Sequence, residues 1–504
     1  MSPGRQRGWT VAAGLGAGIA MAASLPPWGW WPLAPVGAAV LAASLRDRPW
    51  WGRLLAGAAA GLGLYGPGLW WMTEFSGPGY VLTTLLEAGI VGLAMVAVPR
   101  QRGRLVAFPA AVLLADALHG HWPFGGLPLA GLALGQAGGP LTPAARLGGH
   151  LLLVGMVGTA GAALAALAEW WLAGPGLSNR RAGLSNRRAG RSYARAVAGL
   201  GALAGVVACA VAGAVTPLGT PRGSLRVAAV QGGGQRGLRA VFGDPQVPFD
   251  AALAASARIR PPLDLVLWPE DVVNLDGPLA GSPQEEAVAG VARATGATVV
   301  AGVVEDAPGG RFRNAAVAWA PDGRVVDRYD KAHRVPFGEY VPLRGLFSHL
   351  ADLSAVPRDA IAGRGPGTLR TPAGTLGVVI SYEVFFADRA RAAARAGGEV
   401  LLVPTNASSY TTSQVPTQEL AAARLRAVET GRDVVQAAPT GLSTVIGPTG
   451  RVRRRSSLGT AAVVQASVTK RRGQTPAVRL GDAPMVAVAL AVLALARQRR
   501  RKAE

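Results

Sequence analysis

The stretch GVVISYEVFF at 377–386 places a small hydroxyl residue at the point where a buried strand stops. Its apolar start is β-branched, which is typical of a strand inside a sheet. The strand ends abruptly at Ser381, and an Arg/Ala-rich segment at about 387–397 predicts a helix behind it. A nucleophile on such a turn is held in a fixed and accessible position, which covalent catalysis requires. A serine that merely begins a helix gives the same local pattern, so the assignment depends on the rest of the chain.

Two other stretches supply the charged groups that a nucleophile needs. LVLWPED at 265–271 places the carboxylate of Glu270 after a second strand. YDKAHRVPFGEYVP at 329–342 places the amine of Lys331 after a third. The alternatives are a helix-capping Glu270 and a solvated loop lysine, but three such groups, each at the end of its own strand, favour a catalytic site.

The chain is more apolar than a single soluble domain. Half of its 504 residues are hydrophobic and only 16% are charged. Small residues crowd the apolar segments, which lets membrane helices approach one another closely. The first segment could be a cleaved signal peptide, but six more follow it directly, which favours an uncleaved span. The eight expected spans lie at about 9–26, 30–45, 53–72, 80–98, 105–118, 147–172, 196–216 and 484–496, the last extended by upstream residues from about 478.

Arginine residues mark alternate connections between these segments. The odd-numbered connections, such as SLPPWGWW and MTEFSGPGY, carry almost no positive charge. By the positive-inside rule both termini and the even-numbered connections are cytoplasmic. Most of the net charge of +22 is therefore a topology signal, and a nucleic-acid partner has little left to support it. The basic residues concerned are Arg5, Arg7, Arg46, Arg48, Arg53, Arg100, Arg102, Arg104, Arg180, Arg181, Arg187, Arg188, Arg191, Arg195 and the run RQRRRK near the C-terminus.

Seven spans from a cytoplasmic N-terminus place residue 217 outside the membrane. We therefore expect a membrane domain at 1–216, an extracytoplasmic domain at 217–478, and a last span with a basic tail at 479–504. Strands alternate with helices in the middle domain, which is typical of an α/β sandwich. Its clearest expected elements are a strand at 225–231, helices at about 249–259, 283–295 and 417–430, and a hairpin at 314–330 that turns at Pro321-Asp322-Gly323.

Taken together, these segments resemble the bacterial apolipoprotein N-acyltransferases. Glu270, Lys331 and position 381 match the Glu-Lys-Cys triad of the nitrilase superfamily, and eight spans around such a domain match the layout of the acyltransferases. The most specific stretches are VLWPED, YDKAHRVPFGEYVPLR, the SYE turn and ARLRAVETGRDVVQAAPTGLS at 423–443. The resemblance implies a polytopic α-helical membrane domain plus a nitrilase-like αββα sandwich. It also implies transfer of an acyl chain from a phospholipid to the α-amino group of the diacylglyceryl-cysteine that begins a lipoprotein, through an acyl-enzyme.

One position departs from the family, whose nucleophile is Cys where this chain has Ser381. The single cysteine, Cys209, lies in the seventh expected span and cannot replace it. A serine hydroxyl is far less acidic than a thiol and must lose its proton as it attacks. Three interpretations stay open: a working serine enzyme, a slowed one, and an inactive relative that binds lipoproteins. A membrane-anchored nitrilase-type amidohydrolase, in which water resolves the acyl-enzyme, is a further alternative.

The resemblance also assigns roles to residues. Glu270 is expected to act as general base, Lys331 to stabilise the oxyanion, and Ser381 to carry the acyl group. Residues expected to support these groups or to contact substrate are Glu339, Glu383, Tyr382 and Trp268. No metal-ligand cluster and no phosphate loop is evident in the sequence, so no metal and no cofactor is expected. The expected partners are a phospholipid acyl donor and the diacylated N-terminus of a lipoprotein. The protein is expected to be a monomer in the bacterial cytoplasmic membrane.

Overall fold

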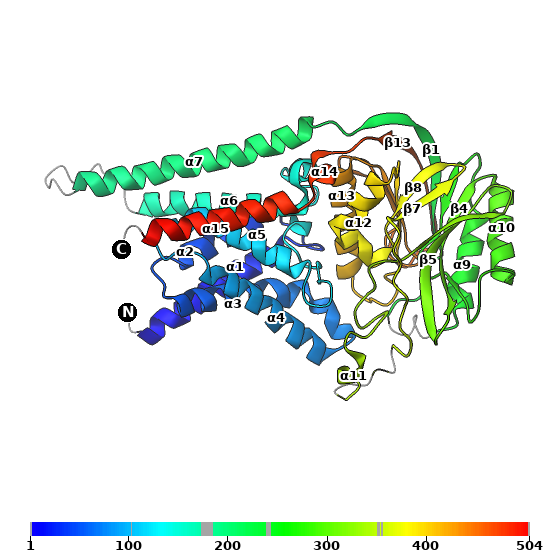
Figure 1. The fold of residues 1–504 in the computed structure, drawn as a ribbon, viewed down its shortest axis with the longest axis horizontal. Helices are drawn as coiled ribbons and strands as arrows, with labels where there is room; N and C mark the ends of the chain where they lie inside the picture. Colours follow the sequence, from blue (N-terminus) through cyan, green and yellow to red (C-terminus); the bar gives the residue numbers. More distant parts are fainter. Residues whose placement is uncertain are drawn as a thin grey trace. The chain divides into compact units, whose positions relative to one another are not determined.

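The computed structural model describes residues 3–101, 103–172, 185–237, 243–349, 353 and 356–501. By its internal contacts the chain divides into two compact units. The first comprises Met1–Thr216 together with Asp482–Glu504, and the second comprises Pro217–Gly481. Figure 1 shows the first unit as a bundle of helices and the second as sheets covered by helices.

Small residues set the spacing of the helices in the first unit. A Cβ atom added at Gly18 in α1 would lie 2.0 Å from the carbonyl oxygen of Ala60 in α3, and one at Gly61 would lie 2.5 Å from Cα of Ala88 in α4. The expected close approach of glycine-rich helices is therefore confirmed. The helices of this unit are α1 (Pro3–Ala23), α2 (Leu33–Ser44), α3 (Trp50–Gly68), α4 (Gly77–Val96), α5 (Arg104–His119), α6 (Ala145–Leu172), α7 (Ser185–Val215) and α15 (Ala483–Arg501), with short 3₁₀ turns η1 (Trp70–Glu74), η2 (Leu134–Gln136) and η3 (Thr142–Ala144).

Within the described part of the chain, three helical segments are long and apolar enough to cross a bilayer. They are Gly77–Val96, Thr142–Leu172 and Tyr193–Val215. Two further apolar helices, Leu33–Ser44 and Ala483–Gln498, are shorter. A membrane protein is therefore supported, while the full set of eight spans stays a prediction.

Two helix boundaries differ from the expected spans. Helix α7 begins at Ser185, so Arg187 to Arg195 belong to the helix and not to the preceding connection. The last helix does not extend upstream towards residue 478, because Gly481 (φ +68°, ψ −157°) breaks the chain between α14 (Pro476–Leu480) and α15. Instead α15 continues to Arg501, through the basic run at its C-terminal end. Arg102, Arg180 and Arg181, which the charge pattern includes, lie outside the described residues.

The second unit contains two mixed sheets. In the first, β1, β2 and β4 are parallel, and β13, β5 and β6 extend it with antiparallel pairs. Its strand order is β13 (Ala462–Arg472), β1 (Thr220–Gln231), β2 (Leu265–Leu267), β4 (Thr298–Ala307), β5 (Arg311–Trp319) and β6 (Val325–Asp330), with β3 (Val273–Asn274) paired to β4. In the second sheet, β8, β9 and β10 are parallel. Its order is β12 (Val452–Arg455), β11 (Thr444–Ile446), β10 (Val434–Ala437), β9 (Leu401–Pro404), β8 (Gly374–Val378) and β7 (Thr368–Thr371).

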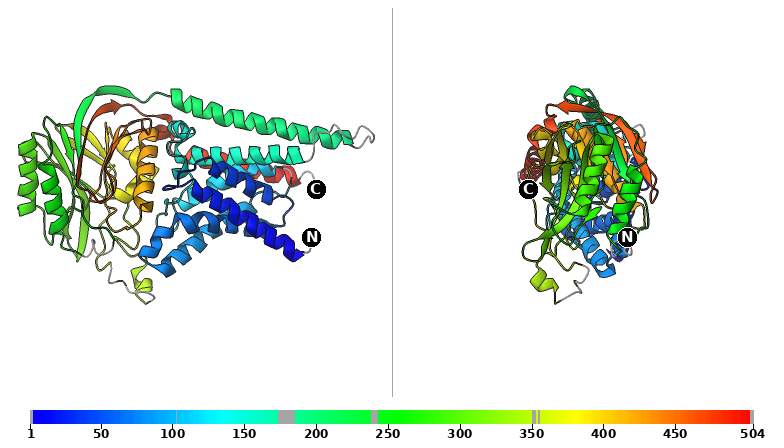
Figure 2. Two further views of the ribbon diagram at one scale, coloured as in Figure 1. Left: turned by 180° about the vertical axis from the view of Figure 1, so that it is seen from behind. Right: turned by 90° about the vertical axis from the view of Figure 1, so that its right-hand side faces the viewer.

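Alternation along the strands separates two cores. In β1, Val227 and Ala229 face the second sheet, where they pack with Val378 and Leu402 in one buried cluster. Ala228 and Val230 point the other way, into a cluster with helices α9 (Gln246–Ser256) and α10 (Pro283–Thr295). Helices α12 (Ala387–Arg395) and α13 (Gln414–Thr430) cover the outer face of the second sheet, and a short α11 (Arg344–Phe347) follows β6. Figures 1 and 2 show the resulting helix–sheet–sheet–helix layers, and the expected αββα sandwich is confirmed.

The connections after several strands form one region of this unit. Glu270 follows β2, Lys331 follows β6, Ser381 follows β8 and Thr405 follows β9. In α/β sheets, the carboxyl ends of parallel strands are the usual place for a functional site. The hairpin expected at 314–330 is formed by β5 and β6, whose antiparallel register pairs Ala316 with Tyr329.

Candidate active site

Ser381 occupies a strained turn at the end of its strand. Its φ is +47°, in the left-handed region that residues with a side chain rarely adopt. A 3₁₀ turn, η4 (Ser381–Phe385), follows at once, and only then does α12 begin. Backbone strain of this kind costs on the order of 1–3 kcal/mol and is found most often at functional sites. Ser381 is thus presented by a rigid turn, with 8% of its surface exposed.

The carboxylate of Glu383 holds this turn in place. The side chain is fully buried and accepts hydrogen bonds from the Tyr329 hydroxyl at 2.8 Å and from the Ile380 backbone N–H at 2.9 Å. It also accepts the backbone N–H groups of Ala332 at 2.8 Å and His333 at 3.0 Å. The Glu383 carboxylate therefore ties the backbone just before Ser381 to the segment after β6. Burial and the negative charge of Glu383 both raise the pKa of Tyr329, which keeps its hydroxyl a donor.

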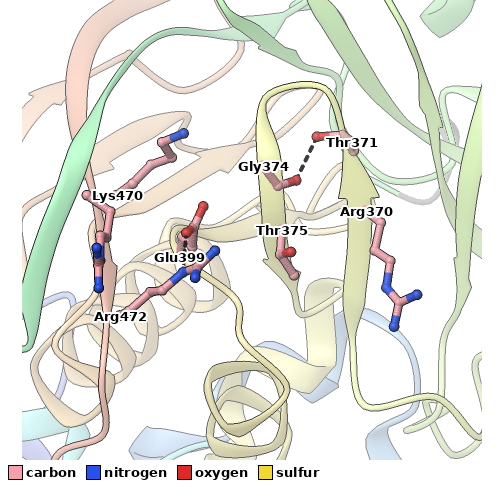
Figure 3. Close-up of a pocket in the computed structure, with 8 residues that line it drawn as sticks. Arg370, Thr371, Gly374, Thr375, Glu399, Lys470 and Arg472 are labelled. Atoms are coloured by element: carbon pink, nitrogen blue, oxygen red, sulfur yellow. Dashed lines mark hydrogen bonds and ion pairs between the residues drawn. The ribbon is translucent and has the colours of Figure 1, made fainter.

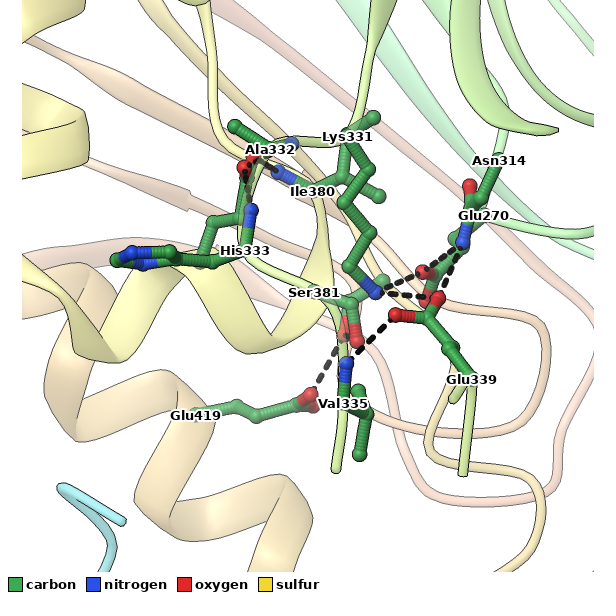
Figure 4. Close-up of polar contacts among 12 residues, drawn as sticks. Glu270, Asn314, Lys331, Ala332, His333, Val335, Glu339, Ile380, Ser381 and Glu419 are labelled. Carbon is green, nitrogen blue, oxygen red and sulfur yellow. Dashed lines mark hydrogen bonds and ion pairs between the residues drawn. The ribbon is translucent and has the colours of Figure 1, made fainter. Parts of the chain in front are cut away.

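Lys331 lies between two carboxylates in the interior. Its Nζ donates to Glu270 Oε1 at 2.8 Å and to Glu339 Oε1 at 2.9 Å, and only 2% of the residue is exposed. Burial by itself lowers the pKa of Lys331, but the two carboxylates together outweigh it and the pKa is raised. The lysine is therefore a permanent cation with a fixed direction. Figure 4 shows its ammonium group pointing towards Ser381.

Asn314 completes this cluster, and sequence reasoning did not single it out. Its Nδ2 donates to Glu270 Oε1 at 2.9 Å and to Glu339 Oε1 at 2.8 Å (Figure 4). Glu339 in turn accepts the Val335 backbone N–H through its other oxygen at 2.7 Å. Glu339 thus orients Lys331 and Asn314 from the loop after β6. The only sequence signal for Asn314 is a polar residue ahead of the apolar run AAVAW in β5.

Close backbone packing fixes Glu270. The N–H of Gly302 in β4 donates to Pro269 O at 3.0 Å, and a Cβ added at Gly302 would lie 2.4 Å from Cα of Glu270. Real Cβ atoms do not approach a backbone atom so closely, so a side chain at this position must displace the Glu270 segment.

If Glu270 takes part in a reaction, Gly302→Ala is expected to lower the rate of that reaction by about 10²-fold, because a misplacement of roughly 1 Å has such a cost. Overpacking is expected to lower the free energy of unfolding by about 1–3 kcal/mol. Initial rates and thermal unfolding of the purified protein measure the two effects. Gly290→Ala in α10 is the control, because a Cβ there meets nothing within 4 Å. Equal rates in the two variants would contradict the close-packing argument.

Trp268 and Tyr382 lie in different surroundings. The Trp268 side chain is fully buried in the core between the first sheet and its helices, and its Nε1 donates to Ser256 Oγ at 3.0 Å. The ring does not reach a surface, and the expectation that Trp268 supports the catalytic groups or contacts substrate stays a prediction. The Tyr382 ring packs edge-on against Phe386, 5.0 Å between ring centroids, and its expected contact with substrate stays a prediction.

A further contact, which sequence reasoning also missed, involves Ser381 itself. Thr405, after β9, places its Oγ1 3.3 Å from Ser381 Oγ and 2.6 Å from Glu419 Oε1. Glu419 lies on α13 and is buried. Figure 4 therefore shows two acidic side chains near Ser381: Glu270, which contacts Lys331, and Glu419, which reaches Ser381 through Thr405.

A basic cavity of about 530 Å³ lies at the opposite end of β8. Figure 3 shows Arg370, Lys470 and Arg472 around the Thr371–Gly374 turn, with Glu399 as the one carboxylate among the lining residues. Arg472 Nε donates to Glu399 Oε1 at 2.7 Å. None of the predicted catalytic residues lines this cavity.

Comparisons with known proteins match both units. The apolipoprotein N-acyltransferase N-terminal domain matches residues 17–164, and the carbon–nitrogen hydrolase family matches residues 226–477. Apolipoprotein N-acyltransferases of Mycolicibacterium smegmatis and Azotobacter vinelandii are each 30% identical to this chain. These alignments cover 96% of the chain and 85% of the first relative, and 97% and 94% for the second. A solved nitrilase-superfamily structure from Saccharomyces cerevisiae is 20% identical with a TM-score of 0.39, covering 50% of this chain and 92% of that one. From the two relatives and the matches to both units, the chain belongs to the apolipoprotein N-acyltransferase family.

Proposed function

We propose that this protein N-acylates lipoproteins: it transfers an acyl chain from a phospholipid to the α-amino group of an N-terminal diacylglyceryl-cysteine. The observation that carries the proposal is the pairing of Ser381 at φ +47° with a buried lysine held by two carboxylates. This arrangement provides a nucleophile, a base and a cation within one rigid cluster. We propose that the protein acts as a monomer.

The first half-reaction forms the acyl-enzyme. Ser381 Oγ attacks the ester carbonyl carbon of the phospholipid while Glu270 takes the hydroxyl proton. Lys331 and the backbone N–H of Tyr382 stabilise the oxyanion of the tetrahedral intermediate. The ester C–O bond then breaks, and the lysophospholipid oxygen leaves with the proton that Glu270 held.

The second half-reaction passes the acyl group to the lipoprotein. The α-amino nitrogen attacks the Ser381 oxyester, and Glu270 takes a proton from the nitrogen as the amide bond forms. The bond between the acyl carbon and Ser381 Oγ breaks, and Glu270 returns the proton to Oγ, which restores the free serine and the ionised base. Membrane helices suit this chemistry, because both substrates are confined to the bilayer.

The direct test is the intact mass of a reporter lipoprotein's N-terminal peptide, produced in a strain that lacks other such acyltransferases. The proposal expects a mass increase of one acyl chain when this protein is present. Release of free fatty acid without acylated peptide would identify a hydrolase instead. Binding of the diacylated peptide with neither product would identify a lipoprotein-binding relative.

We further propose that eight helices span the cytoplasmic membrane and that the second unit lies on its outer side. The Arg pattern supports this orientation by the positive-inside rule, with both termini in the cytoplasm. Among the described residues, three helices meet the length and hydropathy needed for a span, and two apolar helices are shorter.

Cysteine labelling is expected to reveal this topology. In a Cys209→Ala background, which removes the one native cysteine, Ala280→Cys should react with an impermeant maleimide on intact cells, and Gln101→Cys should react only after lysis. Both positions are exposed within their own units. Labelling of Gln101→Cys but not Ala280→Cys in intact cells would reverse the proposed orientation.

A further inference from the structure

The hydroxyl of Thr405 stands between the nucleophile and a buried carboxyl group. Thr405 Oγ1 is 3.3 Å from Ser381 Oγ and 2.6 Å from Glu419 Oε1, and Thr405 itself has no exposed surface. No other hydrogen bond to the Ser381 side chain occurs within the described residues. The hydroxyl of Thr405 carries one proton, so it donates to one neighbour and accepts from the other.

The direction of this chain of hydrogen bonds depends on the charge of Glu419. An ionised carboxylate can only accept hydrogen bonds. The Thr405 hydroxyl would then donate to Glu419 and not to Ser381. A neutral carboxylic acid can donate to Thr405 Oγ1, which frees the Thr405 proton to point at Ser381 Oγ. Burial, opposed by the Thr405 contact and reinforced by the charge of Glu270, raises the pKa of Glu419 to about 8. Glu419 is therefore mainly neutral at pH 7.

We propose that Thr405 is a further catalytic residue for this reaction, donating a hydrogen bond to Ser381 Oγ, and that neutral Glu419 is the positioning residue that turns the Thr405 hydroxyl towards it. This inference rests on the proposed function, because it requires Ser381 to be the nucleophile. The donor stabilises the negative charge that builds on Oγ during attack and again during departure. This role requires no proton transfer between Glu419 and Thr405, because only the direction of their hydrogen bond matters.

A serine needs such a donor more than a cysteine does. A serine alkoxide is a strong base and a poor leaving group, whereas a thiolate forms and leaves with little help. The Thr405–Glu419 pair would therefore stabilise the negative charge on a serine oxygen, which a thiolate sulfur needs less. Glu270 remains the base that receives the Ser381 proton, whereas Glu419 acts on Oγ only through Thr405.

The electrostatic surroundings of Glu419 favour its neutral form. Glu270 and Lys331 influence its carboxyl in opposite senses, and desolvation exceeds both. Glu383 is held by backbone N–H groups, and Arg391 and Arg426 both contact Glu429. The other charged residues of α13, and those of the elements packed against it, are Glu383, Asp388, Arg389, Arg391, Arg395, Arg424, Arg426, Glu429 and Arg479.

The first test compares Thr405→Val with either nucleophile. In the native background, Thr405→Val is expected to slow acyl-enzyme formation by about 10²–10³-fold, as for loss of one preorganised donor to a developing oxyanion. In the Ser381→Cys background the same change should cost far less. Thr405→Ser, which keeps the hydroxyl, should retain most of the rate. Equal losses in both backgrounds would mean that Thr405 only shapes the fold, and would overturn the inference.

The second test is a pH profile of acyl-enzyme formation, followed as lysophospholipid released from labelled phospholipid vesicles with no peptide present. Leaving out the peptide removes titration of the acceptor amine. The native rate should fall as the pH rises through about 8, because Glu419 ionises and turns the Thr405 proton away from Ser381. Glu419→Gln keeps a donor at this position, so its profile should stay flat there. A native profile without this fall, or the same fall in Glu419→Gln, would overturn the role of Glu419.

The two proposals fail in different ways. If the native protein forms no acyl-enzyme while Ser381→Cys does, the proposed function fails at its nucleophile and the inference falls with it. Only the inference fails if the native protein acylates the peptide, Thr405→Val loses the same factor in the native and Ser381→Cys backgrounds, and Glu419→Gln has the native pH profile.

Discussion

Ser381→Ala is expected to stop formation of triacylated lipoprotein, whereas Ser381→Cys is expected to keep or raise the rate. Removing a true nucleophile lowers the rate by several orders of magnitude, about 10⁴-fold or more. A thiol has an ordinary pKa near 8.5 and is deprotonated far more easily beside a carboxylate such as Glu270. The measurement is a time course of the intact mass of the reporter's N-terminal peptide.

The three proteins together separate the possible outcomes. If native protein and Ser381→Ala both leave the reporter diacylated while Ser381→Cys acylates it, the natural protein is an inactive relative with an intact site. If Ser381→Ala acylates as fast as the native protein, serine catalysis is wrong. Both substitutions are small, and the turn that holds position 381 is fixed by Glu383, so equal amounts of the three proteins in the membrane are the control.

Glu270→Gln and Lys331→Met are expected to reduce acyl transfer by several orders of magnitude. Glutamine keeps the shape of Glu270 but cannot take the Ser381 proton. Methionine keeps the packing of Lys331 but cannot neutralise an oxyanion. Initial rates of acyl transfer, corrected for protein in the membrane, test both changes, and near-native turnover in either variant would remove that residue from the mechanism.

Stability has to be separated from chemistry at Lys331. Removing one partner of a buried ion pair commonly costs about 3–5 kcal/mol, because the remaining charge is left uncompensated. Lys331→Met leaves two carboxylates, Glu270 and Glu339, without their cation. The double variant Lys331→Met/Glu339→Gln keeps the native net charge of the cluster and should recover much of the stability. It should not recover activity if the lysine acts on the oxyanion.

Local signals in the sequence predicted much of the second unit. Helix α10 runs over Pro283–Thr295, as expected, because both of its ends are marked. The Ser282 side chain accepts from the Glu285 N–H at the start, and Gly296 takes a left-handed conformation (φ +61°) at the end. Glu270, Lys331 and Ser381 could be proposed for a similar reason: each follows an expected strand, and a residue after a strand is visible without knowing the fold.

Other parts of the site depend on contacts between distant segments. Thr405 is 24 residues from Ser381 and 14 residues from Glu419, and nothing in the local pattern of α13 distinguishes Glu419 from a surface residue of a helix. Trp268 lies two residues before Glu270 in the sequence, and that proximity does not decide whether its ring supports the site or packs in the core. Trp268 lies on the same side as Val266 and joins the core, whereas the chain has already left β2, which ends at Leu267, before it reaches Glu270.

The pairing of β1 with β13 has a consequence for how the chain is connected. Thr220 lies opposite Arg472 in this antiparallel ladder, so the first and last strands of the second unit are neighbours, and α14 follows the last strand before the unit ends at Gly481. The second unit is therefore an insertion whose first and last strands pair with each other. Once this unit has folded, bringing α7 and α15 together costs less loop-closure entropy than their separation in the sequence suggests. Helix α15, which packs against α5, is joined to α7 by what is in effect a short loop. A variant that prevents the β1–β13 pairing should thus loosen the last helix of the first unit as well as the sheet.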